Sequence, residues 1–554
     1  MADRSTTLHY SDFNDPSLDT FIAKTMREFP TPGLAVLVIH GDQIRAKGYG
    51  YSNLQTRTPI TPSTLFFTGS TTKSFTASLA AHLVESQDHP SITWETPLAE
   101  MIRDDFVLDQ TTPRGPWATA TVTMEDCLSH RTGLPRHDLA WVNGFEEIGE
   151  VVRRLRYLPL HRDMRTKFEY SNNPYTAVSY AIEKVLDCPF KDSLKQHIFD
   201  PLEMHDTTYD IEDARKVVKE HEIDLATGYL WNSETHDYEQ VPWTDIPPSR
   251  GAGGIISNVL DYAKWVRHLM KPTNLNAALS ENAVKAIRTP KMLIEPEKPF
   301  TGPQAYGLGL FSRVYQGREV IEHAGAIAGY MANMVMVPPS ATEIERGEKD
   351  SGWAVVTMIN AYSVAQDVVC WHLLDEFLGT PGSERYDVAE EMRKKQAKAQ
   401  ESLEPDKVVE KLFGASAQDS HLEPRLPIAA YEGVYEHPGY RQIQVSARPI
   451  RIWNSSDTPE RSGATEQDRG QNETPLLYLA PPASAKAYIS RVGTLHHVNG
   501  EHWWSHQTTG PSSWFSDKAL KVQFVIGANG KVERMRYQAE PDMADELAFF
   551  EKIE

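Results

Sequence analysis

The sequence predicts a mixed α/β (α+β) protein: an antiparallel sheet flanked by helices and interrupted by an inserted helical lobe, followed by a small all-β domain. Two observations predict this fold class. Strand-like segments cluster near residues 34–51 and again near 306–359, with mainly helix and loop between them. Beyond about residue 425 the pattern changes to short strands and tight turns. The expected division is residues 1–380, a charged helical linker at 381–424, and the all-β domain at 425–554.

The first strand cluster is a predicted hairpin. Leu34 to His40 is an apolar run, Gly41-Asp42 is a turn, and Gln43 to Tyr51 is the returning strand. A helix follows near residues 70–83, and its Ala, Leu and Phe content predicts a buried element. The middle of the chain is mainly helix and loop, with helical stretches expected at 190–199 and 259–270.

The second cluster completes the predicted sheet. Its four strands are expected at residues 306–314, 320–324, 331–337 and 353–359. Because the helical stretch separates them from the first hairpin, the sheet takes its strands from both ends of this region. Residues 386–413 are rich in Glu, Lys and Gln, which is typical of a solvated helical spacer.

The C-terminal part has the alternation of an all-β domain. Strands are expected at residues 431–435, 476–479, 487–497, 522–526 and 532–538. Asn529-Gly530 is a strong two-residue hairpin signal. The polar stretch from Asn454 to Asn472 is expected to be a mobile loop inside this domain.

Composition limits the class of protein. A chain of 554 residues exceeds what one core usually supports, so two or more domains are expected. The hydrophobic and charged fractions, 40% and 24%, are those of an ordinary globular protein. The net charge of −20 argues against nucleic-acid and anionic-membrane partners, since both require a basic face. The expected partner is a small-molecule substrate, and the oligomeric state stays open.

Neither a metal nor another cofactor is expected, and the predicted location is the cytoplasm. The three cysteines, Cys127, Cys188 and Cys370, lie far apart without metal-ligand spacing, which fits a reducing compartment. His502 and His506 fall in an expected strand, where residues four apart are too distant to share a metal easily. The N-terminus lacks the apolar core of a secretory signal, and no stretch approaches eighteen apolar residues.

Ser70 and Lys73 form the first candidate catalytic motif, the only Ser-x-x-Lys in the chain. Residues three apart share one helix face, so the amine is expected to lie beside the hydroxyl. A Ser hydroxyl is a poor nucleophile until a base takes its proton, and a desolvated lysine can be that base. At a helix N-terminus, free N–H groups also favour the negative charge of acyl transfer. A solvated helix surface is the competing interpretation.

Tyr170 and Asn172 supply a phenol and a carboxamide two residues apart, in an expected loop before a helix. A phenol titrates near 10, so it needs a neighbouring cation to act as a base at pH 7, and Lys73 is the candidate cation. The same tripeptide occurs at Tyr51-Ser52-Asn53, where a turn after the first hairpin accounts for it.

His323, Gly325 and Ala326 form the third candidate motif, at the end of an expected strand. Glycine there lets the backbone approach a substrate closely, and the N–H of Ala326 can join that of Ser70 as an oxyanion donor. A second His-x-Gly, His437-Pro438-Gly439, lies near a turn of the β domain. A strand-end His is often structural, which is the competing interpretation.

In this order, the three motifs resemble the active-site set of serine β-lactamase-like hydrolases related to penicillin-binding proteins. Their separations, roughly 100 and then 150 residues, resemble the class C, esterase and D-aminopeptidase branch. Segments 64–75, 128–137 and 251–257 also resemble that superfamily, and the likeness covers about residues 15–380. The tail from Tyr431 resembles the lipocalin-like domain appended to some D-aminopeptidases.

The resemblance implies a role for each motif residue. Ser70 would be the acylated nucleophile, with Lys73 and Tyr170 sharing the base and acid roles. Asn172 would hold the substrate, and the N–H groups of Ser70 and Ala326 would bind the oxyanion. The implied activity is hydrolysis of a carboxylic ester or amide, of D-aminopeptidase or esterase type. An acyltransferase using the same acyl-enzyme, or a catalytically silent binding protein on this fold, are the alternatives.

The third motif departs from dedicated β-lactamases, which carry Lys where this chain has His323. A mostly neutral His lowers the expectation of efficient penicillin hydrolysis. No Glu stands in a class A deacylation motif, so deacylation would rely on Tyr170. The β domain is expected to be a stabilising appendage, with a lid bearing Trp503, Trp504 and Trp514 as the alternative.

Overall fold

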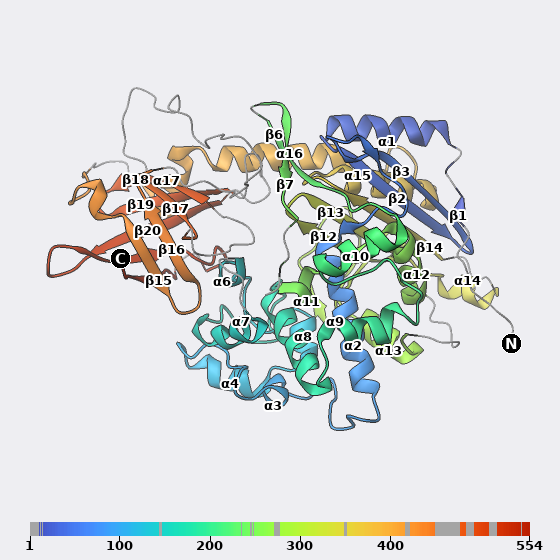
Figure 1. Ribbon diagram of the computed structural model, residues 1–554, viewed down its shortest axis with the longest axis horizontal. Helices are drawn as coiled ribbons and strands as arrows, with labels where there is room; N and C mark the ends of the chain where they lie inside the picture. The colour runs from blue at the N-terminus through green and yellow to red at the C-terminus, as the bar shows by residue number, and fades with distance from the viewer. Residues whose placement is uncertain are drawn as a thin grey trace.

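The computed structural model has a large sheet with its helices at one end and a β-barrel at the other (Figure 1). It describes residues 10–554 except 12, 14, 143–146, 234, 244–245, 247–248, 271–277, 348–351, 416–421, 449–476, 483–491, 509–517 and 544–545. The expected loop at 454–472 and Trp514 therefore lie outside the described residues.

The large sheet takes its strands from two distant parts of the chain, as predicted. Its order is β1-β3-β2-β14-β13-β12-β11-β10-β9, with β4 paired to β3. All pairings are antiparallel except β1 with β3. The strands are β1 (Tyr10–Ser11), β2 (Gly33–His40), β3 (Gln43–Asn53), β4 (Thr58–Pro59), β9 (Met292–Leu293), β10 (Ala305–Tyr306), β11 (Phe311–Tyr315), β12 (Arg318–Ile327), β13 (Tyr330–Val337) and β14 (Trp353–Ile359).

One predicted strand of this sheet is divided. The sequence predicts a single strand over residues 306–314, whereas the structure has β10 and β11. Gly309 between them has a φ of +77°, and the Gly307 N–H bonds the Leu310 carbonyl at 2.8 Å. A left-handed glycine within a tight turn cannot continue an extended strand, so the chain reverses there.

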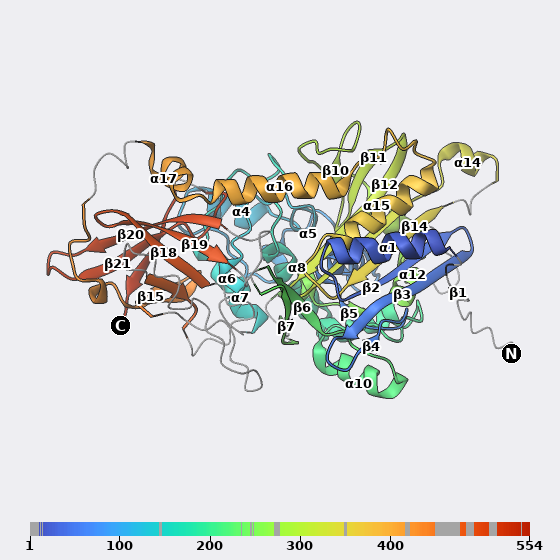
Figure 2. The ribbon, with the colours of Figure 1, turned by 90° about the horizontal axis from the view of Figure 1, so that it is seen from above.

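Alternating side chains of the central strands bury both faces of the sheet. Leu34 and Val36 of β2 belong to the core shared with α1 and α15, which lie together over one face in Figure 2. Ala35 and Leu37, one residue along, face the larger core that contains α2, α8 and α12. Because neighbouring residues point to opposite faces of a strand, β2 is apolar almost throughout.

Helices form the inserted lobe and cover the sheet. The expected helix at 259–270 is α12, and the stretch 190–199 is α9 followed by a π-helical turn. The helices are α1 (Pro16–Glu28), α2 (Thr72–Glu85), α3 (Leu98–Met101), α4 (Arg114–Thr121), α5 (Met124–Leu128), α6 (Leu139–Val142), α7 (Ile148–Arg154), α8 (Asn173–Leu186), α9 (Phe190–Leu194), α10 (Ile211–His221), α11 (Arg250–Gly253), α12 (Val259–Met270), α13 (Glu281–Arg288), α14 (Ala341–Glu345), α15 (Ala365–Leu378), α16 (Val388–Ser402) and α17 (Pro405–Phe413).

Four short strands in the lobe were not predicted from the sequence. They pair as β5 (Phe66–Phe67) with β8 (Ile256–Ser257), and as β6 (Gly228–Asn232) with β7 (Asp237–Val241). The first pair matters for the site, because it ties the segment before Ser70 to the segment after α11.

The C-terminal strands close into an eight-stranded antiparallel barrel, which confirms the all-β prediction. Consecutive strands are neighbours, and β22 pairs with β15 to close it, the up-and-down order of lipocalins. Its strands are β15 (Gly433–His437), β16 (Arg441–Ser446), β17 (Leu477–Ala480), β18 (Val492–Asn499), β19 (His502–Thr508), β20 (Lys518–Ile526), β21 (Val532–Tyr537) and β22 (Ala548–Lys552). The hairpin predicted at Asn529-Gly530 exists, but its connection spans 527–531 rather than two residues.

The helical connector runs beside both parts. In Figures 1 and 2, α16 extends from the region of α15 toward the barrel. Val388 is the one buried residue of α16, as expected for a solvated helix, whereas α17 also has a buried residue. On α17, Val408 packs against Trp504, while Trp503 lies in the barrel core, so neither tryptophan is exposed at a substrate site.

Candidate active site

Ser70 lies in a 3₁₀ turn, Gly69–Thr71, directly before α2. Gly69 begins the turn with a φ of +53°, a conformation that a side chain would strain. The Thr71 hydroxyl is 3.0 Å from the Thr68 carbonyl and 2.6 Å from the Tyr262 hydroxyl, which hold the turn in place. Ser70 is half-buried although its neighbours Gly69 and Thr71 are buried. The turn therefore presents one hydroxyl from an otherwise enclosed backbone.

Lys73, in the first turn of α2, has no exposed surface. Its Nζ lies 3.0 Å from Ser70 Oγ, 2.8 Å from Asn172 Oδ1 and 2.9 Å from the Ala252 carbonyl oxygen. The predicted proximity of amine and hydroxyl is therefore present in the structure. Burial holds the pKa of the amine well below its usual value, and Arg136 adds to this effect whereas Asp138 opposes it.

Tyr170 lies close to both Ser70 and Lys73. Its ring centre is 4.8 Å from Lys73 Nζ and 5.3 Å from the Arg136 guanidinium carbon. Burial raises the pKa of the Tyr170 phenol to about 12, while a hydrogen bond with Ser70 acts in the opposite direction. The sequence predicts that a cationic Lys73 lowers the pKa of this phenol, whereas in the structure its pKa is raised. The same burial that lowers the pKa of the Lys73 amine raises the pKa of the phenol, because burial disfavours the charged form of each group.

Asn172 connects Lys73 to Asp138. It caps α8, so its position follows from where that helix begins. Its Nδ2 donates to Asp138 Oδ1 at 3.2 Å, which leaves Oδ1 for Lys73. Asp138 in turn pairs with Arg136, whose Nε is 2.8 Å from Asp138 Oδ2. Because a carboxylate only accepts hydrogen bonds, Asp138 fixes which way the Asn172 amide points.

Strand β12 passes directly beside the Ser70 turn. Its pairing with β11 ends at Glu322, while its pairing with β13 continues to Ile327, so residues 323–327 have one unpaired edge. A Cβ built on Gly325 would lie 1.8 Å from the Thr68 carbonyl oxygen and 3.0 Å from the Ser70 nitrogen. A Cβ on Gly69 would lie 2.7 Å from the Ala326 nitrogen. Both glycines are therefore required for this backbone approach.

His323 is the first residue of this edge, and its ring is uncharged. Its Nδ1–H donates to the Ala324 carbonyl at 2.6 Å, and its Nε2 accepts from the Tyr306 hydroxyl at 3.1 Å. Burial lowers the pKa of His323 to about 3, and the nearby Lys73 acts in the same direction. The structure therefore brings His323 to the site but gives it no cationic character.

The two repeated tripeptides take structural roles, as their contexts predict. In the first, Ser52 Oγ donates to the Thr58 carbonyl, and Asn53 Oδ1 accepts from the following turn. In the second, His437 Nδ1 accepts from the N–H groups of Gly439 and Tyr440.

Sequence reasoning missed Asp138, Arg136 and Ala252 as members of the site. Arg136 lies within the segment 128–137 and Ala252 within 251–257, and both segments carried the family resemblance. The second segment is tied to α2, because the Ile255 N–H bonds Thr72 Oγ1 at 3.0 Å and Thr76 Oγ1 bonds the Gly251 carbonyl at 2.6 Å. The family resemblance of these two segments could therefore have indicated Arg136 and Ala252. Asp138 lies one residue beyond the first segment.

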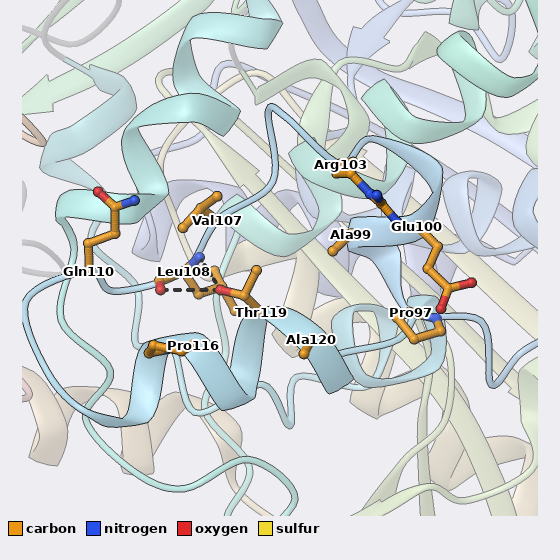
Figure 3. A pocket seen from close by; sticks show the side chains of 10 residues that line it. All are labelled: Pro97, Ala99, Glu100, Arg103, Val107, Leu108, Gln110, Pro116, Thr119 and Ala120. Carbon is orange, nitrogen blue, oxygen red and sulfur yellow. Dashed lines mark hydrogen bonds between the residues drawn. The ribbon is translucent and has the colours of Figure 1, made fainter.

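A cavity of about 470 Å³ lies elsewhere, against α3 and α4 (Figure 3). Its lining includes Glu100, Arg103 and Thr119, and it contains none of the predicted site residues. Within the described residues, no group of three or more His, Cys, Asp or Glu side chains is arranged to hold a metal ion. No helix in the same part of the chain is long and apolar enough to cross a membrane.

Comparisons with known proteins agree with this fold. The family profile described as Beta-lactamase matches residues 18–377. A protein named Unguisins hydrolase ungD', from Aspergillus campestris (strain IBT 28561), is 32% identical over 98% of this chain and 93% of its own length. A D-aminopeptidase from Gluconobacter oxydans (strain 621H) is 23% identical over 67% of this chain and 63% of its own.

Among solved structures, the octameric penicillin-binding protein homologue from Pyrococcus abyssi superposes with a TM-score of 0.56. The match covers 97% of this chain and 100% of that one, at 19% sequence identity, and so shows a shared fold. The matched family profile and the relative that extends over nearly the whole chain carry the family assignment. The chain belongs to the β-lactamase family and is a hydrolase of the β-lactamase-like superfamily.

Proposed function

We propose that the protein cleaves a carboxylic ester or amide through an acyl-enzyme formed on Ser70. One observation carries the proposal: the buried Lys73 amine, 3.0 Å from Ser70 Oγ, has two oxygen atoms as its other partners. Those two, Asn172 Oδ1 and the Ala252 carbonyl, can only accept hydrogen bonds. A neutral amine has two hydrogens and one lone pair. The hydrogens go to the two acceptors, and the lone pair is left facing the Ser70 hydroxyl.

The chemical steps follow from this arrangement. Lys73 Nζ takes the Ser70 proton as Oγ attacks the carbonyl carbon of the substrate. Collapse of the tetrahedral intermediate breaks the bond to the alcohol or amine, which leaves with a proton delivered through Tyr170. A protonated phenol at pH 7 suits that role as a donor, since its pKa is raised to about 12. Water then attacks the acyl carbon and gives a proton to Lys73 Nζ, and the bond to Oγ breaks as Nζ returns that proton to Ser70 Oγ.

In this proposal, backbone N–H groups of β12 and of the Ser70 turn form the oxyanion site. The N–H groups of Ser70 and Ala326 belong to two segments whose approach requires Gly69 and Gly325. Two N–H donors at the carbonyl oxygen stabilise the charge that develops there, typically by several kcal/mol in all. The chemistry is assigned to residues 1–380, with 381–424 as the connector and 425–554 as the barrel domain.

The proposed substrate is a neutral acyl compound of the amide or ester class. One relative is named for hydrolysis of unguisins and another is a D-aminopeptidase, which favours an amide and a D-configured residue. A substrate carboxylate gains nothing from His323, because both ring nitrogens are already hydrogen-bonded and the ring is neutral.

The test is a substrate panel of p-nitrophenyl esters, D- and L-aminoacyl amides, unguisins and nitrocefin. We expect the neutral esters and amides to be cleaved, D-aminoacyl amides faster than L, and nitrocefin most slowly. Ser70→Ala is the control and is expected to abolish turnover of every substrate. Turnover that survives in Ser70→Ala would contradict the proposal, and transfer to an added alcohol in place of water would identify an acyltransferase.

A further inference from the structure

His137 occupies a strained position between two residues of the site. Its φ is +43°, in the left-handed region that a histidine adopts only when its surroundings hold it there. The side chain is fully buried, and burial lowers the pKa of the ring to about 4, so it is neutral. Arg136 precedes it and Asp138 follows it, and these two form the ion pair beside Tyr170 and Asn172. The backbone angle at His137 therefore sets where both side chains point.

Two of the groups that hold His137 come from the barrel. Its backbone N–H donates to Glu540 Oε2 at 2.5 Å, and its ring Nδ1 accepts from the Tyr440 hydroxyl at 2.6 Å. The third, the Pro159 carbonyl, accepts from Nε2–H at 3.0 Å. Tyr440 and Glu540 are themselves buried. More than 300 residues separate Tyr440 from His137 in sequence, so the barrel has to be docked for these bonds to form.

The barrel domain packs closely against residues 157–158 next to this contact. A Cβ on Gly439, next to Tyr440, would lie 2.7 Å from Leu158 Cδ2 and 3.3 Å from Tyr157 Cβ. In Figures 1 and 2, α6 and α7 lie beside the barrel; His137 precedes α6, and Tyr157 and Leu158 follow α7. A buried hydrogen-bonded contact of this kind transmits a displacement rather than absorbing it.

A continuous set of hydrogen bonds leads from this contact to the nucleophile. Asp138, next to His137, accepts from Asn172 Nδ2 at 3.2 Å. Asn172 Oδ1 accepts from Lys73 Nζ at 2.8 Å, and Nζ is 3.0 Å from Ser70 Oγ. If Asp138 moves, the Asn172 amide loses the partner that orients it, and Lys73 loses one of the two acceptors that take its hydrogens.

We propose that the barrel completes the active site, with Tyr440 and Glu540 acting as positioning residues for the Asp138–Asn172–Lys73 hydrogen bonds through His137. The proposal rests on the function proposed above and goes beyond it. The barrel was expected to be a stabilising appendage, with a tryptophan-bearing lid as the alternative. In this proposal the barrel acts instead through Tyr440, between β15 and β16, and Glu540, between β21 and β22.

The test compares two tyrosines that each lose one buried hydroxyl in the full-length protein. Tyr440→Phe removes the donor to His137, whereas Tyr435→Phe removes a hydroxyl that bonds the Tyr431 carbonyl at 2.7 Å inside the barrel. Both should lower Tm to a similar extent. We expect Tyr440→Phe alone to slow labelling of Ser70 by a fluorophosphonate probe about tenfold or more, and to lower kcat for a neutral ester with KM little changed.

Two substitutions of Glu540 give a test that is independent of the tyrosine variants. Glu540→Gln keeps an oxygen acceptor for the His137 N–H and should label near the wild-type rate, whereas Glu540→Ala should be as slow as Tyr440→Phe. A double-mutant cycle then locates the effect. Asn tolerates the left-handed conformation, so in a His137→Asn background, which lacks the ring partner, Tyr440→Phe should cause no further loss.

Three results would count against the proposal. Folded Tyr440→Phe and Glu540→Ala variants that label within twofold of wild type would overturn it and leave the barrel as an appendage. Equal slowing by Tyr435→Phe would show that barrel stability alone is responsible. A wild-type protein that does not label at all would overturn the proposed function, and with it this proposal.

Discussion

Replacing Lys73 by methionine is expected to slow acylation of Ser70 by about 10²–10⁴-fold, the usual contribution of a general base. Methionine is unbranched and close in length, so it can fill the enclosed space that Lys73 occupies. What it lacks is a basic nitrogen, which in the wild type lies 3.0 Å from Ser70 Oγ. The measurement is the rate of fluorophosphonate labelling of the folded variant, with Tm recorded alongside.

Lys73→Arg is the matched control for charge. A guanidinium stays protonated in proteins, so it restores a cation without restoring a base. We therefore expect Lys73→Arg to be as slow as Lys73→Met. Recovery of the wild-type labelling rate by arginine would mean that Lys73 acts as a positive charge, and that the neutral-amine account is wrong.

Gly325→Ala is the second change with a large expected effect. The added Cβ would lie 1.8 Å from the Thr68 carbonyl oxygen, a backbone atom that no side-chain rotation can move away. Strand β12 must then shift from the Ser70 turn, which separates the two N–H groups of the oxyanion site. We expect kcat/KM to fall by about 10²-fold or more and the free energy of unfolding to fall by about 1–3 kcal/mol.

Gly382→Ala provides the comparison, since a Cβ there would have nothing within 4 Å. It should change neither the free energy of unfolding nor kcat/KM measurably. Activity measured by kcat/KM and stability measured by urea unfolding separate the two effects. A Gly325→Ala protein with wild-type kcat/KM would show that the close approach of β12 is not needed for catalysis.

Local patterns accounted for most of the fold. The strands β2, β13 and β14 are apolar runs that the sequence predicts almost to the residue, because central strands buried on both faces need such runs. The more polar β3 was predicted from the turn that pairs it with β2. The barrel strand β16 was missed because only Ile443 and Val445 alternate inward among polar neighbours. Strands of two residues, such as β5 and β8, carry no periodic signal at all.

The site was predicted in part. Ser70 and Lys73 meet because a helix places residues three apart on one face, which is local information. The role of Asp138 depends on contacts with Asn172 and Arg136 that only the folded chain brings together. Likewise, burial lowers the pKa of Lys73 and raises the pKa of Tyr170, and burial is a property of the fold.

The barrel's contact with the site was beyond any sequence signal. Tyr440 and Glu540 approach His137 from distant parts of the chain. Tyr440 follows the triplet His437-Pro438-Gly439, but nothing in that pattern indicates a contact with His137. The cytoplasmic location, the domain boundaries and the roles of the site residues stay predictions.

Trapping the acyl group gives the most direct test of the central claim. The full-length protein is incubated with a neutral p-nitrophenyl ester, quenched in acid, and examined by intact mass and peptide mapping. We expect one added acyl mass on the peptide containing Ser70, which disappears with time as the acid product forms, and no adduct in Ser70→Ala. An adduct on another residue, or release of product by wild type without any adduct at Ser70 under rapid quench, would contradict the account.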